Sequence, residues 1–304
     1  MRPQRCSKQS KPGLGALGLL LLLLVVSPAP EAAAAERGPL VGGRFEYTVA
    51  PGDFLIKIGA RFGVDYRTIA RESGIEVDAT LHPGQKLTID NRHIVPDGYG
   101  DGLILNLPQR MLYLIANGTV EAAYPVAVGR PDWPTPTGGF TVAAKEIDKT
   151  WIVPPSIQEE MRCTGRPVLT EVPPGPDNPL GRYWLGLSIP ALGIHGTNAP
   201  ASIYGFRSHG CIRLHPDDIA ALFPHVALGT RGELVYRPLL IAAAGGRVFL
   251  EAHRDVYNKG GVSLDAARRL ATERGLAERI DWALAETVIA REEGIARDVT
   301  AEGS

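Results

Sequence analysis

Apolar positions between residues 103 and 144 come in short runs that are separated by turn residues. The runs cover 103–107, 111–115, 120–128 and 140–144, and the pair Asn117-Gly118 stands between the second and the third. Runs of this length around an Asn-Gly pair predict antiparallel strands joined by tight hairpins. We therefore expect a mainly β sandwich or barrel, closed by a last strand at 230–236.

A smaller unit is predicted at 45–91 by a change from period two to helical spacing and back. A short alternating stretch is followed by a Pro-Gly-Asp turn, and we expect Asp53 to cap the first helix. A second helix is predicted from Asp65 and a closing strand over 86–89. The expected order is β-α-α-β, a small α+β domain.

The last part of the chain, 247–304, carries helical spacing. Ser263 is a predicted N-cap, and apolar residues recur over 264–271 and again over 276–289. We expect a helical C-terminal extension that docks on the preceding domain. Docking of a partner is the alternative.

The segment 147–181 shows no period and is rich in proline. A loop of this length in a compact domain is usually functional or disordered. Proline restricts the unfolded chain, so we expect an ordered lid. Trp151 and Trp184 flank it, and these two tryptophans are the expected substrate contacts.

The N-terminus is typical of an export signal. Basic residues precede an apolar run of about 13 residues, 14–26, and small residues end at Ala35. The run falls short of the roughly 20 residues that span a bilayer. We expect a signal peptide over 1–35, cleavage near Ala35, no transmembrane segment afterwards, and location in the periplasm, associated with the cell wall.

Composition excludes one class of partner. Lys and Arg number 32 against 33 Asp and Glu, a net charge of -1, so no polyanion-binding field is indicated and nucleic acid is not expected. Beyond the predicted signal, Cys163 and Cys211 are the only cysteines. We expect Cys163 to be a bystander in a loop, and a Cys163–Cys211 bridge is the alternative.

Candidate chemistry is concentrated in 194–214. Cys211 has His209 two positions before it and His195 further upstream, and an imidazole activates a thiol by taking its proton. Gly210 permits a sharp turn, and Arg213 points to the same side as Cys211 if the run is extended. These residues lack zinc-site spacing, so neither a metal nor another cofactor is expected.

Two motifs in this stretch resemble those of a known family. His-Gly-Thr at 195–197 with Ser-His-Gly-Cys-Ile-Arg at 208–213 resembles the signature of the L,D-transpeptidases, the YkuD-type catalytic domain. The segments 134–138, 153–156 and 172–181 are similar to parts of the periplasmic branch of that family. We place the catalytic domain at 101–237, and the resemblance implies a β-sandwich or barrel fold.

The resemblance implies a covalent acyl transfer on peptidoglycan. The thiol would attack the diamino acid carbonyl of a tetrapeptide stem, release D-alanine, and pass the acyl group to an amine. The implied catalytic set is Cys211 as nucleophile, His195 as base, and the Gly196 carbonyl as its orienting partner. The implied substrate and oxyanion set is Ser208, His209, Gly210 and Arg213, with the amides of Gly210 and Cys211 as oxyanion donors.

The acceptor stays open at this level. The amine of another stem would give a cross-link, the lysine of an envelope lipoprotein would give a tether, and water would give an L,D-carboxypeptidase or an amidase that detaches wall proteins. A non-catalytic wall-binding protein and a metallopeptidase are further alternatives.

The unit at 45–91 also resembles a known module. Tyr-x-Val-x-x-Gly-Asp at one end and Pro-Gly-Gln-x-Leu-x-Ile at the other are similar to a LysM domain. This implies a site for N-acetylglucosamine-containing glycans on the turns that hold Gly52, Asp53, Phe54 and Leu81. Phe54 and Ser73 depart from the usual pattern, so a purely structural role is the alternative.

Overall fold

The computed structural model describes residues 38–303. The predicted signal peptide, 1–35, lies outside this range. Between residues 38 and 303, none of the helices combines the length and the apolar character that crossing a membrane requires.

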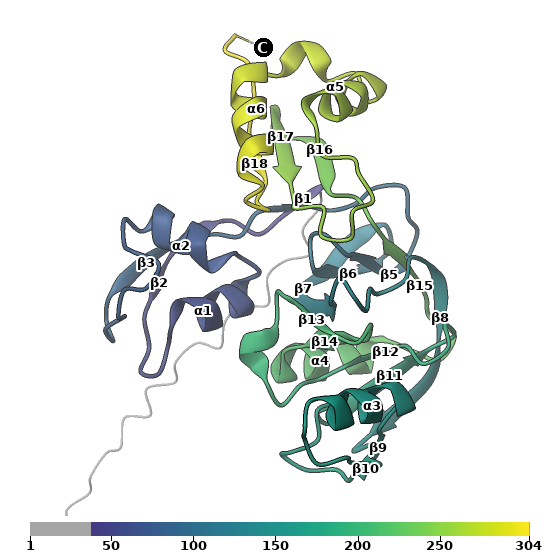
Figure 1. Ribbon diagram of the computed structural model, residues 1–304. Helices are drawn as coiled ribbons and strands as arrows, with labels where there is room; N and C mark the ends of the chain where they lie inside the picture. The colour runs from purple at the N-terminus through teal and green to yellow at the C-terminus, as the bar shows by residue number, and fades with distance from the viewer. Residues whose placement is uncertain (1–37, 304) are drawn as a thin grey trace, which may run out of the picture. The chain divides into compact units, whose positions relative to one another are not determined.

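One large β-sheet forms the centre of the protein (Figure 1). Its strands follow the order β13-β7-β14-β12-β11-β8-β15-β5-β6, and β7 also pairs with β6. That extra pairing joins the last strand to the second, so the sheet closes on itself with β13 outside the ring, and the expected β sandwich or barrel is confirmed. The strands are β5 (Gly102–Asn106), β6 (Met111–Ala116), β7 (Thr119–Gly129), β8 (Gly138–Ile147), β11 (Tyr183–Leu187), β12 (Gly193–His195), β13 (Phe206–Ser208), β14 (Ile212–Leu214) and β15 (Arg231–Val235).

The hairpin between β6 and β7 forms where the sequence predicts it. Asn117 and Gly118 have φ of 53° and 69°, the pair of left-handed residues that a type I′ turn requires. The Asp101 carboxylate accepts their two N–H groups at 3.0 and 2.9 Å. The turn brings Leu112 and Val126 into a fully buried core.

One short α-helix and two 3₁₀ helices flank the strands that carry the candidate motif. Helix α4 (Pro216–Leu222) begins after His215, whose side chain accepts the Asp217 N–H as its N-cap. The 3₁₀ helices η1 (Pro200–Ser202) and η2 (Phe223–His225) complete this region. Ile219 of α4 is buried in the same core as β12 and β14, so the helix supports these strands from behind.

The unit at 45–91 has the predicted β-α-α-β order. Strands β2 (Arg44–Thr48) and β3 (Lys86–Asp90) pair antiparallel, with α1 (Leu55–Phe62) and α2 (Tyr66–Glu72) between them in sequence. Strand β1 (Leu40–Val41) pairs with β4 (His93–Ile94) beside this unit.

The predicted cap at Asp53 is wrong. Phe54 occupies the N-cap position of α1 and makes no side-chain cap bond. The Asp53 carboxylate instead accepts the Ala50 N–H at 2.9 Å and the Tyr47 hydroxyl at 2.6 Å. It therefore closes the preceding turn, because a carboxylate satisfies nearby turn donors as readily as helix donors.

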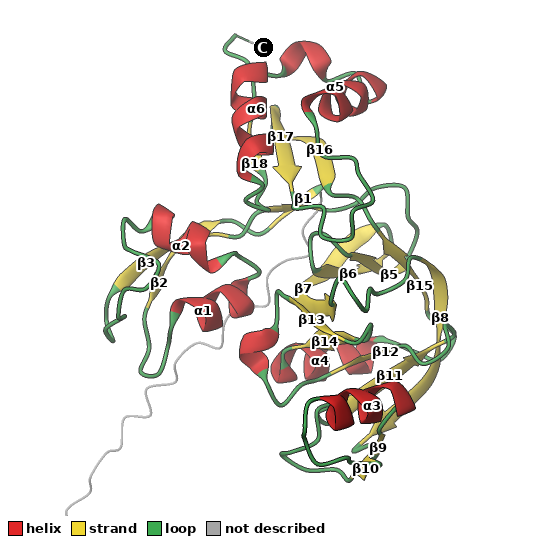
Figure 2. Ribbon diagram, in the orientation of Figure 1, coloured by secondary structure: helices red, strands yellow, loops and turns green. Residues whose placement is uncertain are grey.

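The C-terminal extension contains both predicted helices, α5 (Leu264–Glu273) and α6 (Trp282–Arg291), and the 3₁₀ turn η3 (Ala277–Arg279). It also contains a sheet that the sequence analysis missed, formed by β16 (Leu239–Ala244), β17 (Arg247–Ala252) and β18 (Arg297–Asp298). Residues 247–252 are therefore a strand. Their partner strand lies outside the range assigned to the extension, and pairing with it overrides local pattern (Figure 2).

The proline-rich segment is ordered. It contains β9 (Trp151–Ile152), α3 (Pro155–Cys163) and β10 (Glu171–Val172), with β9 and β10 paired antiparallel. Cys163 is the last residue of α3, so its predicted place in a loop is wrong. Cys163 and Cys211 are both free thiols, which removes the bridge alternative in this structure.

Candidate active site

Strand register brings the candidate residues onto one face of the sheet. Trp184 of β11 pairs with His195 of β12, and His195 pairs with Arg213 of β14. Side chains of directly paired residues lie on the same face. Cys211 directly precedes β14, two residues before Arg213, and the charge of Arg213 acts on its thiol.

The His195 ring is held by a neighbouring backbone group and a tryptophan. Its Nδ1 lies 2.7 Å from the Gly196 carbonyl, and because a carbonyl only accepts, Nδ1 carries the proton. The ring stacks on Trp184, with ring centroids 5.6 Å apart at 22°. The Nε2 lone pair is therefore the basic position of a buried imidazole in a fixed orientation.

Burial shifts both members of the pair toward their neutral forms. It lowers the pKa of His195 to about 3, and the nearby Arg213 cation adds to this effect. Burial also raises the pKa of the Cys211 thiol, opposed by the Gly193 backbone amide and by Arg213. Both groups are therefore favoured in their neutral forms, a thiol and a neutral imidazole.

The loop before Cys211 is fixed by hydroxyl groups. Gly210 has φ of +107°, which a side chain would strain. Thr135 donates its hydroxyl to the Gly210 carbonyl at 2.6 Å, and Ser208 donates to the Cys211 carbonyl at 2.5 Å. Ser208 Oγ also accepts the Gly210 N–H at 3.1 Å. Of the two amides expected as oxyanion donors, that of Gly210 is already engaged within the loop.

His209 turns toward the lid. Its Nε2 lies 2.5 Å from Glu160 Oε2 on α3, and Trp133 packs edge-on against the ring at 4.4 Å. Arg130 donates to the same carboxylate at 3.0 Å, and Arg130 and then His209 lower the pKa of Glu160. No sequence signal identified Glu160, because its contacts come from residues distant in the chain.

The Arg213 side chain is partly satisfied. Its Nε is buried and has no hydrogen-bond partner among residues 38–303. A buried guanidinium N–H without a partner is costly, so a ligand oxygen would be favourable there.

A residue from beyond the sheet supports the loop. Tyr257 donates its hydroxyl to the Gly129 carbonyl at 2.7 Å and accepts the Thr135 N–H at 3.3 Å. Thr135 Oγ1 in turn accepts the Gly129 N–H at 2.9 Å. The sequence analysis missed this support, since nothing near Tyr257 marks it as part of the site.

The two turns predicted to hold a glycan lie side by side. Backbone bonds join Val49 to Gly84 and Gln85, which places the 82–85 turn next to the one at 51–53. Gly52 and Phe54 are exposed, Leu81 is half-buried, and Asp53 is engaged in its turn. In the described part of the chain, no group of three or more His, Cys, Asp or Glu is placed to hold a metal ion.

Comparisons with known proteins follow the same division. A model of the L,D-transpeptidase catalytic domain matches residues 100–236, and a LysM domain model matches 47–90. The chain is 34% identical over 239 residues to the probable L,D-transpeptidase ErfK/SrfK of Escherichia coli strain K12, which covers 76% of this chain and 74% of that protein. The chain belongs to the L,D-transpeptidase family.

Other members of the L,D-transpeptidase family match over shorter spans. ErfK/SrfK of Salmonella typhimurium, also named a probable L,D-transpeptidase, is 33% identical over 66% of this chain and 65% of its own length. The probable L,D-transpeptidase YbiS of Escherichia coli strain K12 is 36% identical over 56% of each chain. A mutant L,D-transpeptidase structure from Enterococcus faecium is 25% identical, with a TM-score of 0.34, over 45% of this chain and 50% of its own.

Proposed function

We propose that this L,D-transpeptidase acts on peptidoglycan through a thioester on Cys211. The donor is a tetrapeptide stem, attacked at the carbonyl of its diamino acid, and the leaving group is D-alanine. The observation that carries the proposal is the register that pairs His195 with Arg213, two residues after Cys211, with His195 Nδ1 bonded to the Gly196 carbonyl at 2.7 Å.

A neutral Cys211 thiol and a neutral His195 imidazole can supply and accept every proton that the proposed reaction moves. As the sulfur–carbon bond forms, the Cys211 proton passes to Nε2 of His195, and the Gly196 carbonyl stabilises the imidazolium through Nδ1–H. The imidazolium then protonates the departing amine of D-alanine. An acceptor amine attacks the thioester, loses its proton to His195, and the thiolate leaves and is reprotonated.

The surrounding groups supply charge stabilisation in this proposal. We assign the oxyanion contact to the amide of Cys211, since that of Gly210 donates within the loop. Arg213 would pair with a substrate carboxylate or with the thiolate. Ser208 and His209 shape the turn.

We also propose the following division of the chain into a signal, two domains and an extension. A signal over 1–35 exports the chain to the periplasm, 45–91 is a LysM domain that holds wall glycan through its paired turns, 101–237 is catalytic, and 247–304 is an extension. The acceptor is an amine of a second stem or of an envelope lipoprotein. The matches of family models at 47–90 and 100–236 support the limits proposed for the LysM domain and the catalytic domain.

Intact-protein mass spectrometry tests the chemistry. The mature chain is incubated with a carbapenem and, separately, with a tetrapeptide muropeptide, with and without an amine acceptor. Cys163→Ala is the matched control, because both cysteines are free thiols. We expect an adduct on wild type and Cys163→Ala, none on Cys211→Ala, and acceptor-dependent ligation. An adduct that yields only hydrolysed product would replace transfer with hydrolysis, and no adduct would refute the nucleophile.

A further inference from the structure

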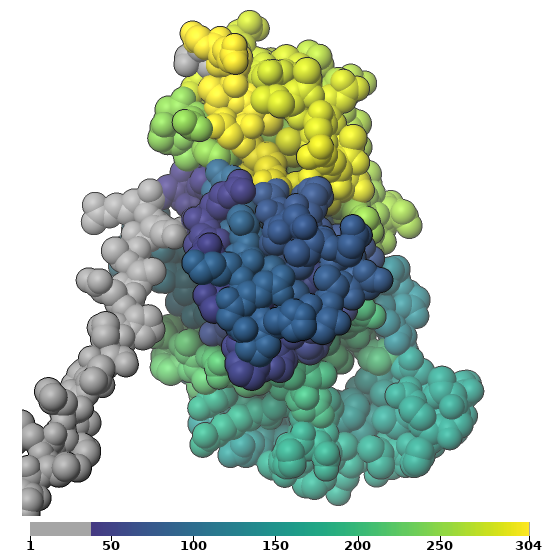
Figure 3. Space-filling view, turned by 90° about the vertical axis from the view of Figure 1, so that its left-hand side faces the viewer, coloured from purple at the N-terminus to yellow at the C-terminus, as the bar shows by residue number. Residues whose placement is uncertain are grey.

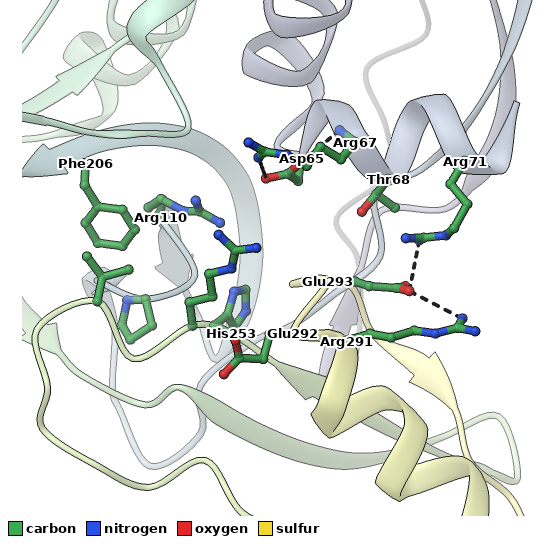
Figure 4. Close-up of a pocket in the computed structure, with 13 residues that line it drawn as sticks. Asp65, Arg67, Thr68, Arg71, Arg110, Phe206, His253, Arg291, Glu292 and Glu293 are labelled. Carbon is green, nitrogen blue, oxygen red and sulfur yellow. Dashed lines mark hydrogen bonds and ion pairs between the residues drawn. The ribbon is translucent and has the colours of Figure 1, made fainter. Parts of the chain in front are cut away.

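A groove outside the active site is shared by three parts of the chain. One cavity of about 320 Å³ is lined by residues of α2, of the turn that precedes β6 and of the C-terminal extension (Figure 4). A second, of about 370 Å³, extends it between α1, α2 and η1. The two cavities share lining residues and so lie next to each other, and together we call them the groove; the shared set is Asp65, Arg67, Arg110, Phe206 and Arg254.

The groove is strongly cationic in a chain whose net charge is -1. Asp65 pairs with Arg67 at 3.6 Å, and Glu293 pairs with Arg71 at 2.9 Å. The charged side chains that line the groove outside these two ion pairs carry a net positive charge. Six arginines line the two cavities against three carboxylates, and the arginines are Arg67, Arg71, Arg110, Arg207, Arg254 and Arg291. Among residues 38–303, no ion pair is formed by Arg110, Arg207 or Arg254.

Arg110 is built into the wall. Its guanidinium lies 4.0 Å from the ring centroid of Tyr204 and 5.3 Å from that of Phe206, so its plane is held by aromatic contact. Its Nε is buried and without a hydrogen-bond partner among the described residues, as is the hydroxyl of Ser202 in the same wall. An oriented guanidinium with an unused donor matches a carboxylate.

One wall of the groove is close in sequence to the active loop. Phe206 and Arg207 line it and are the first two residues of β13, whose last residue, Ser208, donates to the Cys211 carbonyl. Arg207 and Cys211 are four positions apart, at most about 14 Å of extended chain. A peptide of a few residues spans that distance.

We propose that this groove binds the carboxylates of a peptidoglycan stem peptide while a reacting carbonyl or amine lies at Cys211. The inference rests on the proposed function and adds a place for the acidic groups of its substrate. The arginines Arg110, Arg207 and Arg254 bind the anionic groups, and the aromatic wall contacts the aliphatic parts of the stem.

Binding to the mature chain carrying Cys211→Ala tests the groove without turnover. The probe is a fluorescent stem tetrapeptide free of glycan, compared with the same peptide after amidation of its carboxylates. We expect the double variant Arg207→Gln/Arg254→Gln to bind the acidic peptide about three- to tenfold more weakly than the parent chain. Added salt should weaken peptide binding more steeply in the chain with both arginines intact than in the double variant. Arg269→Gln on α5 is the matched control, an exposed arginine outside the groove.

Arg110→Lys gives a second measurement, since it keeps the charge and removes the planar fork, and it should also weaken binding. Equal binding of the acidic and amidated peptides, or an equal loss in Arg269→Gln, would overturn the proposal. Acylation of the wild type by the carbapenem separates the two ideas. Failure to acylate refutes the catalytic proposal, whereas normal acylation with unchanged binding in the groove variants refutes this one.

Discussion

The active-site imidazole is oriented by an uncharged group. A carbonyl at 2.7 Å from His195 Nδ1 fixes the tautomer without adding the negative charge that an aspartate would supply. Burial therefore determines the protonation state, and the neutral thiol and neutral imidazole are favoured together. In the proposed mechanism, the nucleophile is generated when substrate binds, by transfer of the thiol proton to Nε2.

This state predicts slow alkylation of Cys211 at neutral pH. In a Cys163→Ala background, the rate with iodoacetamide should keep rising with pH beyond the range of a free thiol, whose pKa is about 8.5, because burial raises the pKa of Cys211. A rate already at its plateau between pH 5 and 7 would indicate a thiolate–imidazolium pair and contradict the prediction.

Trp184 should matter through the orientation of His195. A methyl group at Gly193 would lie 2.3 Å from Trp184 Cη2, so Gly193→Ala must displace the indole that stacks on His195. We expect acylation by a carbapenem to slow about 10- to 100-fold. Gly139→Ala, whose methyl group would approach no atom closer than 4.0 Å, is the control. A wild-type rate in Gly193→Ala would show that the stacking has no role.

At the scale of elements, the lid is joined to the motif by charge. Helix α3 places Glu160 between Arg130 and His209, at 3.0 and 2.5 Å. Asn178 fastens the other end of the lid, where its amide donates to the Lys149 carbonyl at 2.9 Å and its Oδ1 accepts the Leu180 N–H at 2.9 Å. The two ends of the lid continue the paired strands β8 and β11, and these side chains fix the segment between them.

Neutralising Glu160 should loosen this segment. Glu160→Gln removes the charged partner of Arg130 and His209, and we expect trypsin to cleave within 147–181 about two- to fivefold faster. Glu159→Gln, one residue earlier on the same helix, is the control. Equal cleavage of both variants at the wild-type rate would show that the ion pair does not hold the lid.

At the scale of the whole molecule, a buried carboxylate of the extension contacts the catalytic domain and the segment that joins it to the 45–91 unit. Glu251 of β17 is fully buried; its Oε1 lies 2.8 Å from His93 Nδ1 and 2.7 Å from His253 Nε2, and Gln109 donates to it at 2.9 Å. Its Oε2 accepts the Ile94 N–H at 2.6 Å.

Ion pairs with largely buried carboxylates reinforce this junction. Arg297 of β18 donates to Glu72 of α2 at 2.7 Å, and Arg71 pairs with Glu293 at 2.9 Å. In the space-filling view the yellow C-terminal residues lie directly against the blue residues of the 45–91 unit (Figure 3). The extension therefore contacts both preceding units.

Removing the buried carboxylate should be costly. Glu251→Ala leaves His93, Gln109 and the Ile94 N–H without their acceptor, and we expect the free energy of unfolding to fall by about 3–5 kcal/mol in urea denaturation at pH 7. Glu121→Ala, an exposed position on β7, should change it by less than about 0.5 kcal/mol. A loss below about 1 kcal/mol for Glu251→Ala would contradict the account.

The difference in the free energy of unfolding between wild type and Glu251→Ala should shrink in acid. Burial raises the pKa of Glu251, but His93 and His253 outweigh it and lower the pKa to about 2. The folded carboxylate stays ionised below its unfolded pKa of about 4.5, so its contribution is full above that value and is lost as pH falls toward 2. The gap between wild type and Glu251→Ala should therefore narrow between these two values.

The sequence by itself determined what depends on near neighbours. The Asn117-Gly118 hairpin and the His215 cap follow from the conformations and donors of adjacent residues. The 195–197 and 208–214 motifs indicated the family, and strand alternation placed Arg213 beside Cys211. Asp53 shows the limit, because a carboxylate can serve two sets of local donors equally well.

Only the tertiary structure decided what depends on residues far apart. Glu160 and His209 are separated by 49 positions, and Tyr257 and Gly129 by 128, so no local pattern could pair them. Residues 247–252 form a strand because β16 pairs with them, and the cationic groove exists because three segments place their arginines together. Burial, which sets the protonation of His195, is likewise created only when the sheet closes.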